Sequence, residues 1–230
     1  MLYAVVKSIA AGLLSLIFHF RAIGAENVPR QGPFLVAANH VSFLDPVAVA
    51  AGLWRPVYFM AKAELFQVPL LGTLIRALNA YPLERAGADV RALRHGLALL
   101  KAGRALLVFP EGTRGVEGIL RPGKPGVAML ATASQAPVIP AYVRGTGRAL
   151  PRGATWPRRA GITVAYGAPL RFDRTRGREQ YQEITDQIMA AVGRLKAEVE
   201  GAGASATPES ALPTHAASPA RRLLPLGQYH

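Results

Sequence analysis

Short apolar runs alternate along this chain with longer segments in which apolar residues recur at helical spacing. Apolar runs of four to six residues, bounded by turn residues, are typical of strands buried on both faces of a sheet. Asp, Pro and Gly residues mark where the intervening helices begin and end. The pattern predicts strands at residues 34–38, 56–60, 80–83, 105–109, 138–143 and 162–166, and helices at 45–52, 69–78, 89–103, 126–134 and 180–199.

The alternation of strands with helices predicts an α/β fold. We expect a single domain, residues 21–200, built on a mixed, largely parallel central sheet that is flanked by helices. After residue 200 the chain becomes rich in Ala, Gly, Ser, Thr and Pro and has no apolar period. We therefore expect a disordered C-terminal tail at residues 201–230.

The N-terminal segment, residues 1–20, is apolar, and no charge lies between Lys7 and Arg21. That uncharged stretch is thirteen residues long, whereas a helix that spans a bilayer needs about 20. We therefore expect a membrane-associating helix that lies in the interface, which would make the protein monotopic or peripheral. A short membrane span and a signal peptide are the alternatives, although Ile-Gly-Ala at 23–25 is a poor cleavage site.

The 230 residues carry a formal net charge of +13, and most of the 27 basic residues are arginines. Guanidinium groups suit anionic partners, although a GC-rich genome explains the same bias equally well. Residues 144–178 hold nine arginines and the single acid Asp173, which fits an anionic membrane surface, an acidic carrier protein or nucleic acid. The lack of helix-turn-helix, zinc-finger and aromatic RNA-binding signatures argues against nucleic acid. The lack of cysteine excludes disulfides, a thiol nucleophile and Cys-ligated metal sites.

Polar residues follow two of the predicted strands, at the edge where α/β proteins place their chemistry. In the first segment His40 precedes Asp45 by five residues, and a proline follows Asp45 at the start of a predicted helix. One interpretation is a general base whose tautomer the carboxylate fixes. The alternative is that Asp45 is only a helix N-cap and His40 an ordinary polar residue. Ser42 offers a competing nucleophile, but no Gly-x-Ser-x-Gly motif surrounds it.

The second polar segment is Phe-Pro-Glu-Gly-Thr-Arg at residues 109–114. Gly112 permits a tight turn or a positive φ, Thr113 offers a hydroxyl and an N–H group, and Arg114 offers a fork for phosphate. Because Glu111 repels phosphate, we expect it to orient an arginine or to accept a hydrogen bond from a substrate hydroxyl. The alternative is a strand-ending turn with a solvated Glu–Arg pair.

Two further basic residues are candidate anion ligands. Arg85 follows the strand predicted at 80–83, and Lys124 lies just before a predicted helix. A helix N-terminus attracts anions, and a third cation at the same sheet edge would serve as a second phosphate ligand. The alternatives are a surface arginine and a plain basic loop.

Taken in order, these segments resemble the four sequence blocks of the glycerolipid acyltransferase family, whose best-known members are the 1-acyl-sn-glycerol-3-phosphate acyltransferases. The similarity covers roughly residues 20–170, and the blocks are Asn39-His40-x4-Asp45, then Arg85, then Phe109-Pro110-Glu111-Gly112-Thr113-Arg114, then Val138-Ile139-Pro140-Ala141. One position departs from the pattern, because Asn79 stands where the second block usually opens with glycine. Asparagine tolerates a positive φ better than most residues, so we expect the turn to survive.

The resemblance implies an O-acyltransferase that moves an acyl group from a thioester to the free hydroxyl of 1-acylglycerol-3-phosphate (lysophosphatidic acid), making phosphatidic acid in phospholipid biosynthesis. It implies that His40 is the general base and Asp45 its orienter. It implies no metal and no cofactor, with acyl-CoA or acyl carrier protein as co-substrate. The implied phosphate site comprises Arg85, Glu111, Gly112, Thr113 and Arg114, and the implied secondary positions are Asn39 and Lys124, with Ile139 and Pro140 on the acyl-donor side.

The expected location is the cytoplasmic face of the cell membrane, because the implied substrate and product are membrane lipids. Within the enzyme class, glycerol-3-phosphate or another lysolipid is the alternative acceptor. From a different class, the alternative is a catalytically silent membrane-binding protein of the same fold. That alternative predicts that His40→Ala leaves the cellular role intact, and the presence of every catalytic block residue except the glycine at Asn79 argues against it.

Overall fold

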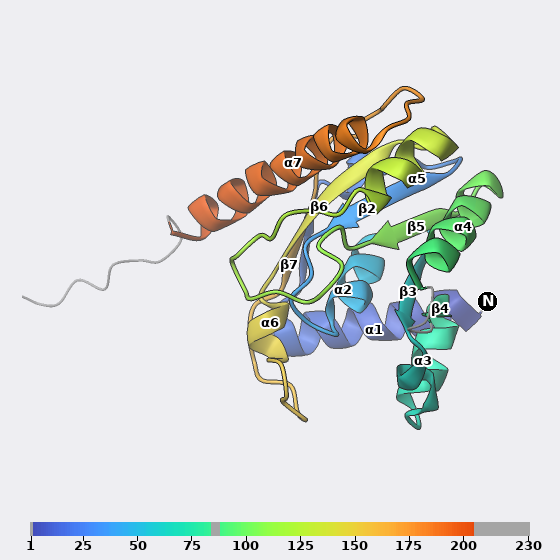
Figure 1. Ribbon diagram of the computed structural model, residues 1–230. Coiled ribbons are helices and arrows are strands. Elements are labelled where there is room, and N and C mark those ends of the chain that lie inside the picture. Colours follow the sequence, from blue (N-terminus) through green and yellow to red (C-terminus); the bar gives the residue numbers. More distant parts are fainter. Residues whose placement is uncertain (1, 84–87, 205–230) are drawn as a thin grey trace, which may run out of the picture.

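The computed structural model describes residues 2–83 and 88–204. This part of the chain forms a seven-stranded sheet with the order β1-β7-β6-β2-β5-β3-β4 (Figure 1). Neighbouring strands are parallel, except that β6 and β7 are antiparallel. The mixed, largely parallel sheet predicted from the sequence is therefore confirmed. The strands are β1 (Arg21–Ile23), β2 (Phe34–Ala38), β3 (Val57–Lys62), β4 (Ala80–Leu83), β5 (Ala105–Val108), β6 (Val138–Arg144) and β7 (Thr163–Tyr166).

Helices cover both faces of the sheet (Figure 1). Helices α1 and α2 pack on one face, and α4, α5 and α7 pack on the other. The α-helices are α1 (Leu2–Phe18), α2 (Asp45–Gly52), α3 (Leu71–Ala77), α4 (Ala88–Lys101), α5 (Gly126–Ser134), α6 (Thr146–Ala149) and α7 (Arg178–Ala204). Two short 3-10 helices are η1 (Ala25–Asn27) and η2 (Ala63–Gln67).

The central strand β2 shows why its sequence is an unbroken apolar run and does not alternate between apolar and polar residues. Phe34 and Val36 join the apolar cluster under α1 and α2, whereas Leu35 and Ala37 join the cluster under α4, α5 and α7. Successive side chains of a strand point to opposite faces, and here both faces are covered. All five residues of β2 are consequently buried.

Several element boundaries differ from the sequence prediction. Strand β1 and helix α6 were not predicted, because each is too short to show a period: β1 has three exposed residues and α6 has four residues. Helix α7 continues to Ala204, past the expected domain end at residue 200. The rest of the expected tail, residues 205–230, lies outside the described residues.

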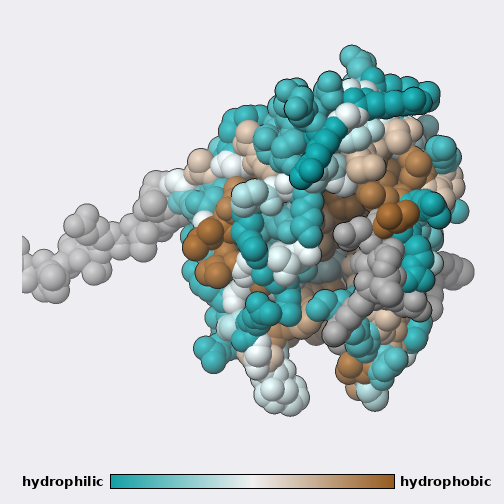
Figure 2. Space-filling view, viewed as in Figure 1, coloured by the Kyte–Doolittle hydropathy of each residue, from teal (hydrophilic) through white to brown (hydrophobic). Residues whose placement is uncertain are grey.

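Helix α1 has 17 residues and packs Leu14 and Phe18 into the core beside α2. None of the helices in the described part of the chain is long and apolar enough to cross a membrane. At the lower edge of Figure 1, η2 with α3 and the loop after α6 project beyond α1, one toward each of its ends. The same edge shows two protrusions with a hollow between them in the space-filling view (Figure 2).

Candidate active site

His40 lies two residues beyond the carboxyl end of β2, off helix α2, as predicted. Its Nδ1 atom lies 2.7 Å from Oδ2 of Asp45, and its ring stacks on Phe109 with the ring centroids 4.0 Å apart. The Asp45 contact favours the tautomer with the proton on Nδ1 and leaves Nε2 as an acceptor. The His40 side chain is 18% exposed, so the ring is held from two sides but remains accessible.

The Asp45 carboxylate is fully buried and has polar partners on both oxygens. Oδ2 accepts hydrogen bonds from the backbone N–H groups of Val41 (2.6 Å) and Ser42 (2.8 Å), in addition to the His40 contact. Oδ1 accepts a hydrogen bond from the Thr146 hydroxyl at 2.5 Å. A buried charge is tolerated only with such partners, so the loop between β2 and α2 folds around this carboxylate.

The N-cap interpretation of Asp45 is wrong. Asp45 is the first residue of α2, Leu44 occupies the N-cap position, and no side chain caps the helix. The fold-back of residues 41–44 instead brings the carboxylate to His40, as the general-base interpretation requires. Ser42 is fully buried and its hydroxyl donates to the backbone oxygen of Leu150 at 3.0 Å, which disfavours Ser42 as a nucleophile.

Glu111 lies beneath the His40 loop rather than at its surface. Its Oε1 accepts a hydrogen bond from the backbone N–H of His40 at 3.1 Å, and the residue is only 4% exposed. Burial raises the pKa of this carboxyl above its usual range, and the neighbouring His40 and Arg121 backbone groups only partly oppose that effect. Glu111 therefore supports the backbone that carries His40. Its expected roles in the phosphate site, as an arginine orienter or as an acceptor from a substrate hydroxyl, stay predictions.

The rest of the 109–114 segment forms an exposed turn above that carboxylate. Gly112 has φ +69°, as its predicted conformational freedom allows, and its N–H donates to the backbone oxygen of Phe109 at 3.0 Å. A Cβ added at Gly112 would lie 2.9 Å from Cε of Lys124, so the lysine side chain crosses directly over the turn. Thr113 is exposed. The turn therefore brings Gly112, Thr113 and Lys124 to one surface.

Arg114 lies over the Phe43 ring, with Cζ 3.6 Å from the ring centroid. The pKa of Arg114 is lowered chiefly by burial and then by the like charge of Arg152, while Asp45 opposes the shift. Arg114 therefore feels the charges of both Asp45 and Arg152. Arg152 was not predicted as a site residue, although it belongs to the arginine-rich region that the sequence singled out.

The other predicted site residues take different places. Asn39 exchanges two hydrogen bonds with the backbone of Val143, at 2.9 and 2.7 Å, and so ties the end of β2 to β6. Ile139 and Pro140 are buried in β6 opposite β2, so they reach the site only as part of the sheet. Arg85 lies outside the described residues. Asn79 has φ +63°, which confirms that it adopts the conformation expected of the missing glycine.

Thr146, whose hydroxyl donates to Asp45, is a site residue that the sequence did not reveal. Thr146 begins α6, with one residue between it and the end of β6. The Glu117 carboxylate fixes the backbone on either side of Thr146, because it accepts hydrogen bonds from the N–H groups of Gly145 (2.6 Å) and Gly147 (2.8 Å). The available signal was a Gly-Thr pair just after a predicted strand. Because Thr146 lies 101 residues from Asp45 in the sequence, no local pattern could link the two residues.

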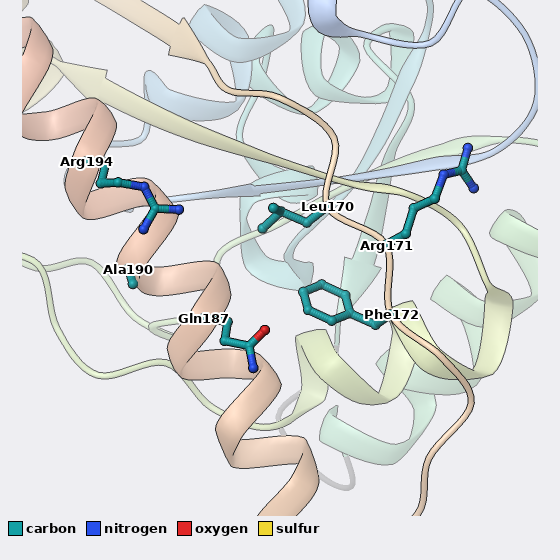
Figure 3. Close-up of a pocket in the computed structure, with 6 residues that line it drawn as sticks. All are labelled: Leu170, Arg171, Phe172, Gln187, Ala190 and Arg194. Carbon is teal, nitrogen blue, oxygen red and sulfur yellow. The ribbon is translucent and has the colours of Figure 1, made fainter.

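Residues of α7 line two grooves, both away from the His40 loop. One has a volume of about 300 Å³ and lies between α7 and the segment that follows β7 (Figure 3). The other has a volume of about 690 Å³ and lies between α7 and the β1–β7 edge. Neither includes His40 or Arg114. Within the described part of the chain, no three His, Cys, Asp or Glu residues cluster as metal ligands would.

Fold and site together define an α/β protein that holds a carboxylate–histidine pair and a nearby guanidinium at the carboxyl edge of its sheet. The model of the acyltransferase family matches residues 19–144, and the chain belongs to this family.

The chain is similar to 1-acyl-sn-glycerol-3-phosphate acyltransferases from several organisms. The Bacillus subtilis (strain 168) enzyme is 31% identical over 134 residues, which cover 58% of this chain and 66% of the relative. The chloroplastic enzyme BAT2 of Brassica napus is 34% identical over 57% of this chain, and the match spans only 39% of that relative. The crystal structure of the 1-acyl-sn-glycerophosphate acyltransferase PlsC from Thermotoga maritima superimposes with a TM-score of 0.72 at 28% identity, covering 86% of this chain and 79% of that one.

Proposed function

We propose that this protein transfers an acyl group from a thioester to the free hydroxyl of 1-acylglycerol-3-phosphate and so makes phosphatidic acid. The observation that carries the proposal is the His40–Asp45 pair, in which a buried carboxylate fixes one ring nitrogen and leaves the other accessible. The relatives from Bacillus subtilis and Brassica napus are 1-acyl-sn-glycerol-3-phosphate acyltransferases, which supports this choice of acceptor.

The His40 ring performs both proton transfers of this reaction. Nε2 takes the proton of the acceptor hydroxyl as its oxygen attacks the thioester carbonyl carbon. The ester C–O bond forms, the C–S bond breaks, and the departing sulfur takes the proton from His40. Asp45 stabilises the imidazolium that exists between the two transfers. The partners of Asp45 hold its carboxylate in the orientation that faces His40.

The acceptor phosphate would bind at the turn beside the ring. Arg114 supplies a guanidinium, Lys124 a point charge, and Gly112 and Thr113 backbone and hydroxyl donors. Arg85 completes the phosphate site in the family pattern. Asn79 stands at the position of the family glycine and has a positive φ, which glycine would also adopt without strain.

The donor would be acyl-CoA or acyl carrier protein, used as co-substrate without a separate cofactor. We place the protein at the cytoplasmic face of the cell membrane, bound as a monotopic or peripheral protein through α1. The sole charged residue of α1 is Lys7, and exposed apolar side chains on this helix support the placement. An acceptor panel that includes glycerol-3-phosphate and other lysolipids tests the headgroup.

The decisive experiment measures thioester consumption by the purified protein with lysophosphatidic acid and each donor. We expect turnover by the wild type, none by His40→Ala, and unchanged turnover by His19→Asn, which alters an exposed histidine outside the site. Absence of wild-type turnover with either donor on every lysophospholipid would sink the proposal. Activity that survives His40→Ala would show that another group is the base.

A second experiment tests the phosphate site. Arg114→Ala should raise the Michaelis constant for a phosphorylated acceptor by at least about tenfold, because a charge-assisted contact is lost. The control is Arg104→Ala, which removes an exposed arginine from the turn between α4 and β5. An unchanged constant in the Arg114 variant removes this residue from the phosphate site.

A further inference from the structure

Glu117 lies in a tight turn of the loop between β5 and α5, outside the two polar segments that the sequence singled out. The N–H of Ile119 donates to the backbone oxygen of Val116 at 3.1 Å, so residues 116–119 form a β-turn with Glu117 in its second position. Gly118 takes the third position with φ +77°, which glycine adopts without strain. The local sequence Val-Glu-Gly-Ile therefore fixes the point at which the Glu117 side chain leaves the loop.

Both oxygens of the Glu117 carboxylate bind the backbone at the start of α6. Oε1 accepts a hydrogen bond from the N–H of Gly145 at 2.6 Å, and Oε2 accepts one from the N–H of Gly147 at 2.8 Å. In Figure 1 the loop that follows β5 reaches down beside α6. The first N–H groups of a helix have no partner within it, and a carboxylate binds them through charge-assisted hydrogen bonds. Glu117 therefore holds the chain on both sides of Thr146.

The Glu117 carboxylate lies so close to α6 that it leaves no room for a side chain at Gly147. A Cβ added at Gly147 would lie 2.6 Å from Oε2 of Glu117 and 3.5 Å from Cγ2 of Val41. Gly147 lies within the helix, so its backbone conformation suits any residue and only the space is restricted. On the other side, a Cβ added at Gly145 would lie 1.9 Å from the backbone oxygen of Gly161. The Gly-Thr-Gly sequence at 145–147 therefore follows from the close packing around Thr146.

Helix α6 is bonded to the His40–Asp45 loop near both of its ends. At its start the Thr146 hydroxyl donates to Oδ1 of Asp45 at 2.5 Å, and both side chains are fully buried. Directly after its last residue, the backbone oxygen of Leu150 accepts a hydrogen bond from the Ser42 hydroxyl at 3.0 Å. A shift of α6 would therefore move a donor away from the carboxylate that faces His40.

The loop that carries Glu117 is also bonded to His40, which closes a ring of contacts. The N–H of Gly115 donates to the backbone oxygen of His40 at 2.7 Å. The His40 ring contacts Asp45, and Asp45 accepts from Thr146. Glu117 holds the backbone around Thr146 and leads through Gly115 back to His40. A closed ring restrains its members more than an open chain does, because displacing one member strains the contacts on both of its sides.

We propose that Glu117 is a positioning residue for the His40–Asp45 pair and acts through α6 and Thr146. The inference deepens the proposed function and rests on it, because it assigns part of the geometry of the base to a residue outside the four sequence blocks of the family. Asp45 must face Nδ1 of His40 if Nε2 is to remain the acceptor. Loss of the Glu117 carboxylate releases the start of α6, and the Asp45 carboxylate then turns away from that orientation.

The first test removes the carboxylate and measures kcat and KM in the thioester assay. Glu117→Ala loses both hydrogen bonds and should lower kcat by about tenfold with KM within about twofold, because the base is displaced while the acceptor site is not. Glu117→Gln keeps one acceptor oxygen and should give an intermediate kcat. The control is Glu183→Ala, which removes an exposed glutamate from α7 and should leave both constants unchanged. A wild-type kcat in Glu117→Ala would overturn the proposal.

A second variant displaces the same carboxylate without altering Glu117. Gly147→Ala puts a methyl group where Oε2 lies, while alanine favours the helix over glycine, so the protein should fold and kcat should fall as in Glu117→Ala. The matched control is Gly12→Ala, at a helical glycine of α1 that has nothing within 4 Å of an added Cβ. The control should keep kcat within about twofold of the wild type. A Gly147→Ala variant with wild-type kcat would contradict the proposal.

A double variant tests the route through Thr146. If Glu117 acts through Thr146, then kcat of Glu117→Ala with Thr146→Val should lie within about twofold of the slower single variant, because both substitutions open the same ring. Two independent roles would instead multiply the two losses in kcat. Multiplied losses would therefore refute the route through Thr146 and the proposal with it.

Magnetic resonance separates this proposal from the proposed function. The nitrogen chemical shifts of the His40 ring, assigned by their loss in His40→Ala, show which ring nitrogen carries the proton whether or not the protein turns over. We expect the proton on Nδ1 in the wild type, and a larger share on Nε2 in Glu117→Ala and Gly147→Ala. These changes in a protein that never turns over would refute the acyl-transfer proposal alone. A protein that turns over, with the same shifts and the same kcat in Glu117→Ala, would refute the role of Glu117 alone.

Discussion

Replacing Thr146 by valine tests how the Asp45 carboxylate is held. The Thr146 hydroxyl donates to Oδ1 of Asp45 at 2.5 Å, and both side chains are fully buried. Valine has nearly the same shape but puts a methyl group against the carboxylate oxygen. The variant therefore loses a hydrogen bond to a charged group and leaves that oxygen without a donor, without opening a cavity.

The expected cost follows from the contact. A hydrogen bond to a buried charged group contributes about 1.5–3 kcal/mol, and one kcal/mol corresponds to about 2–4 °C in melting temperature for a domain of this size. We expect Thr146→Val to lower the melting temperature by about 3–12 °C. We also expect at least about a fivefold lower kcat with little change in KM, because Thr146 positions Asp45 and does not touch substrate.

Thr146→Ser is the matched control. Serine keeps the hydroxyl and removes one methyl group, which costs about 1 kcal/mol of burial, so kcat should stay near the wild-type value. Thermal denaturation followed by circular dichroism and the thioester assay give the two readouts. A valine variant that melts with the wild type and turns over at its rate would refute the assigned role of Thr146.

Three further substitutions test other features of the site. Burial raises the pKa of Glu111, so ionising this carboxyl in the folded protein lowers stability as the pH rises above the ordinary glutamate pKa. Glu111→Gln, which can still accept from the His40 N–H, should therefore gain in melting temperature over the wild type as the pH rises from about 4, and a constant difference would contradict this. Gly112→Ala should lower the melting temperature by about 2–4 °C, because φ is +69° and the added Cβ would meet Lys124; an unaltered melting temperature would mean that the turn relaxes freely. At Asn79, where φ is +63°, valine should cost about 1–2 kcal/mol and glycine less than about 1 kcal/mol in chemical denaturation, and equal costs would remove the backbone explanation.

The sheet was predictable where burial alone decides the sequence. Strand β2 is covered on both faces and appears in the sequence as an unbroken apolar run with the observed limits. Strand β1 has no such signal, because its three residues are exposed and begin with Arg21. Its place depends on pairing with β7, a partner that local periodicity cannot reveal.

The site was predictable where its parts are close in the sequence. His40 and Asp45 are five residues apart, and the loop between them folds back as the spacing suggested. Thr146 contributes to the same carboxylate from 101 residues away, with no local pattern to mark it. Glu111 was expected to orient an arginine or to accept a hydrogen bond from a substrate hydroxyl, and its contact with the His40 backbone N–H was not foreseen. A charged residue such as Glu111 marks a segment as a candidate site, but only the packed structure shows which groups that residue contacts.

The pairing of β1 with β7 also bears on the order in which the chain is made. The two strands are about 140 residues apart, so at about 5–20 residues per second β7 is synthesised roughly 7–28 s after β1. During that interval β1 has no partner, and α1 has neither the completed sheet beneath one apolar face nor a covering on the other. The core-facing side of the nascent N-terminal helix therefore stays uncovered until the last strand of the sheet has been made.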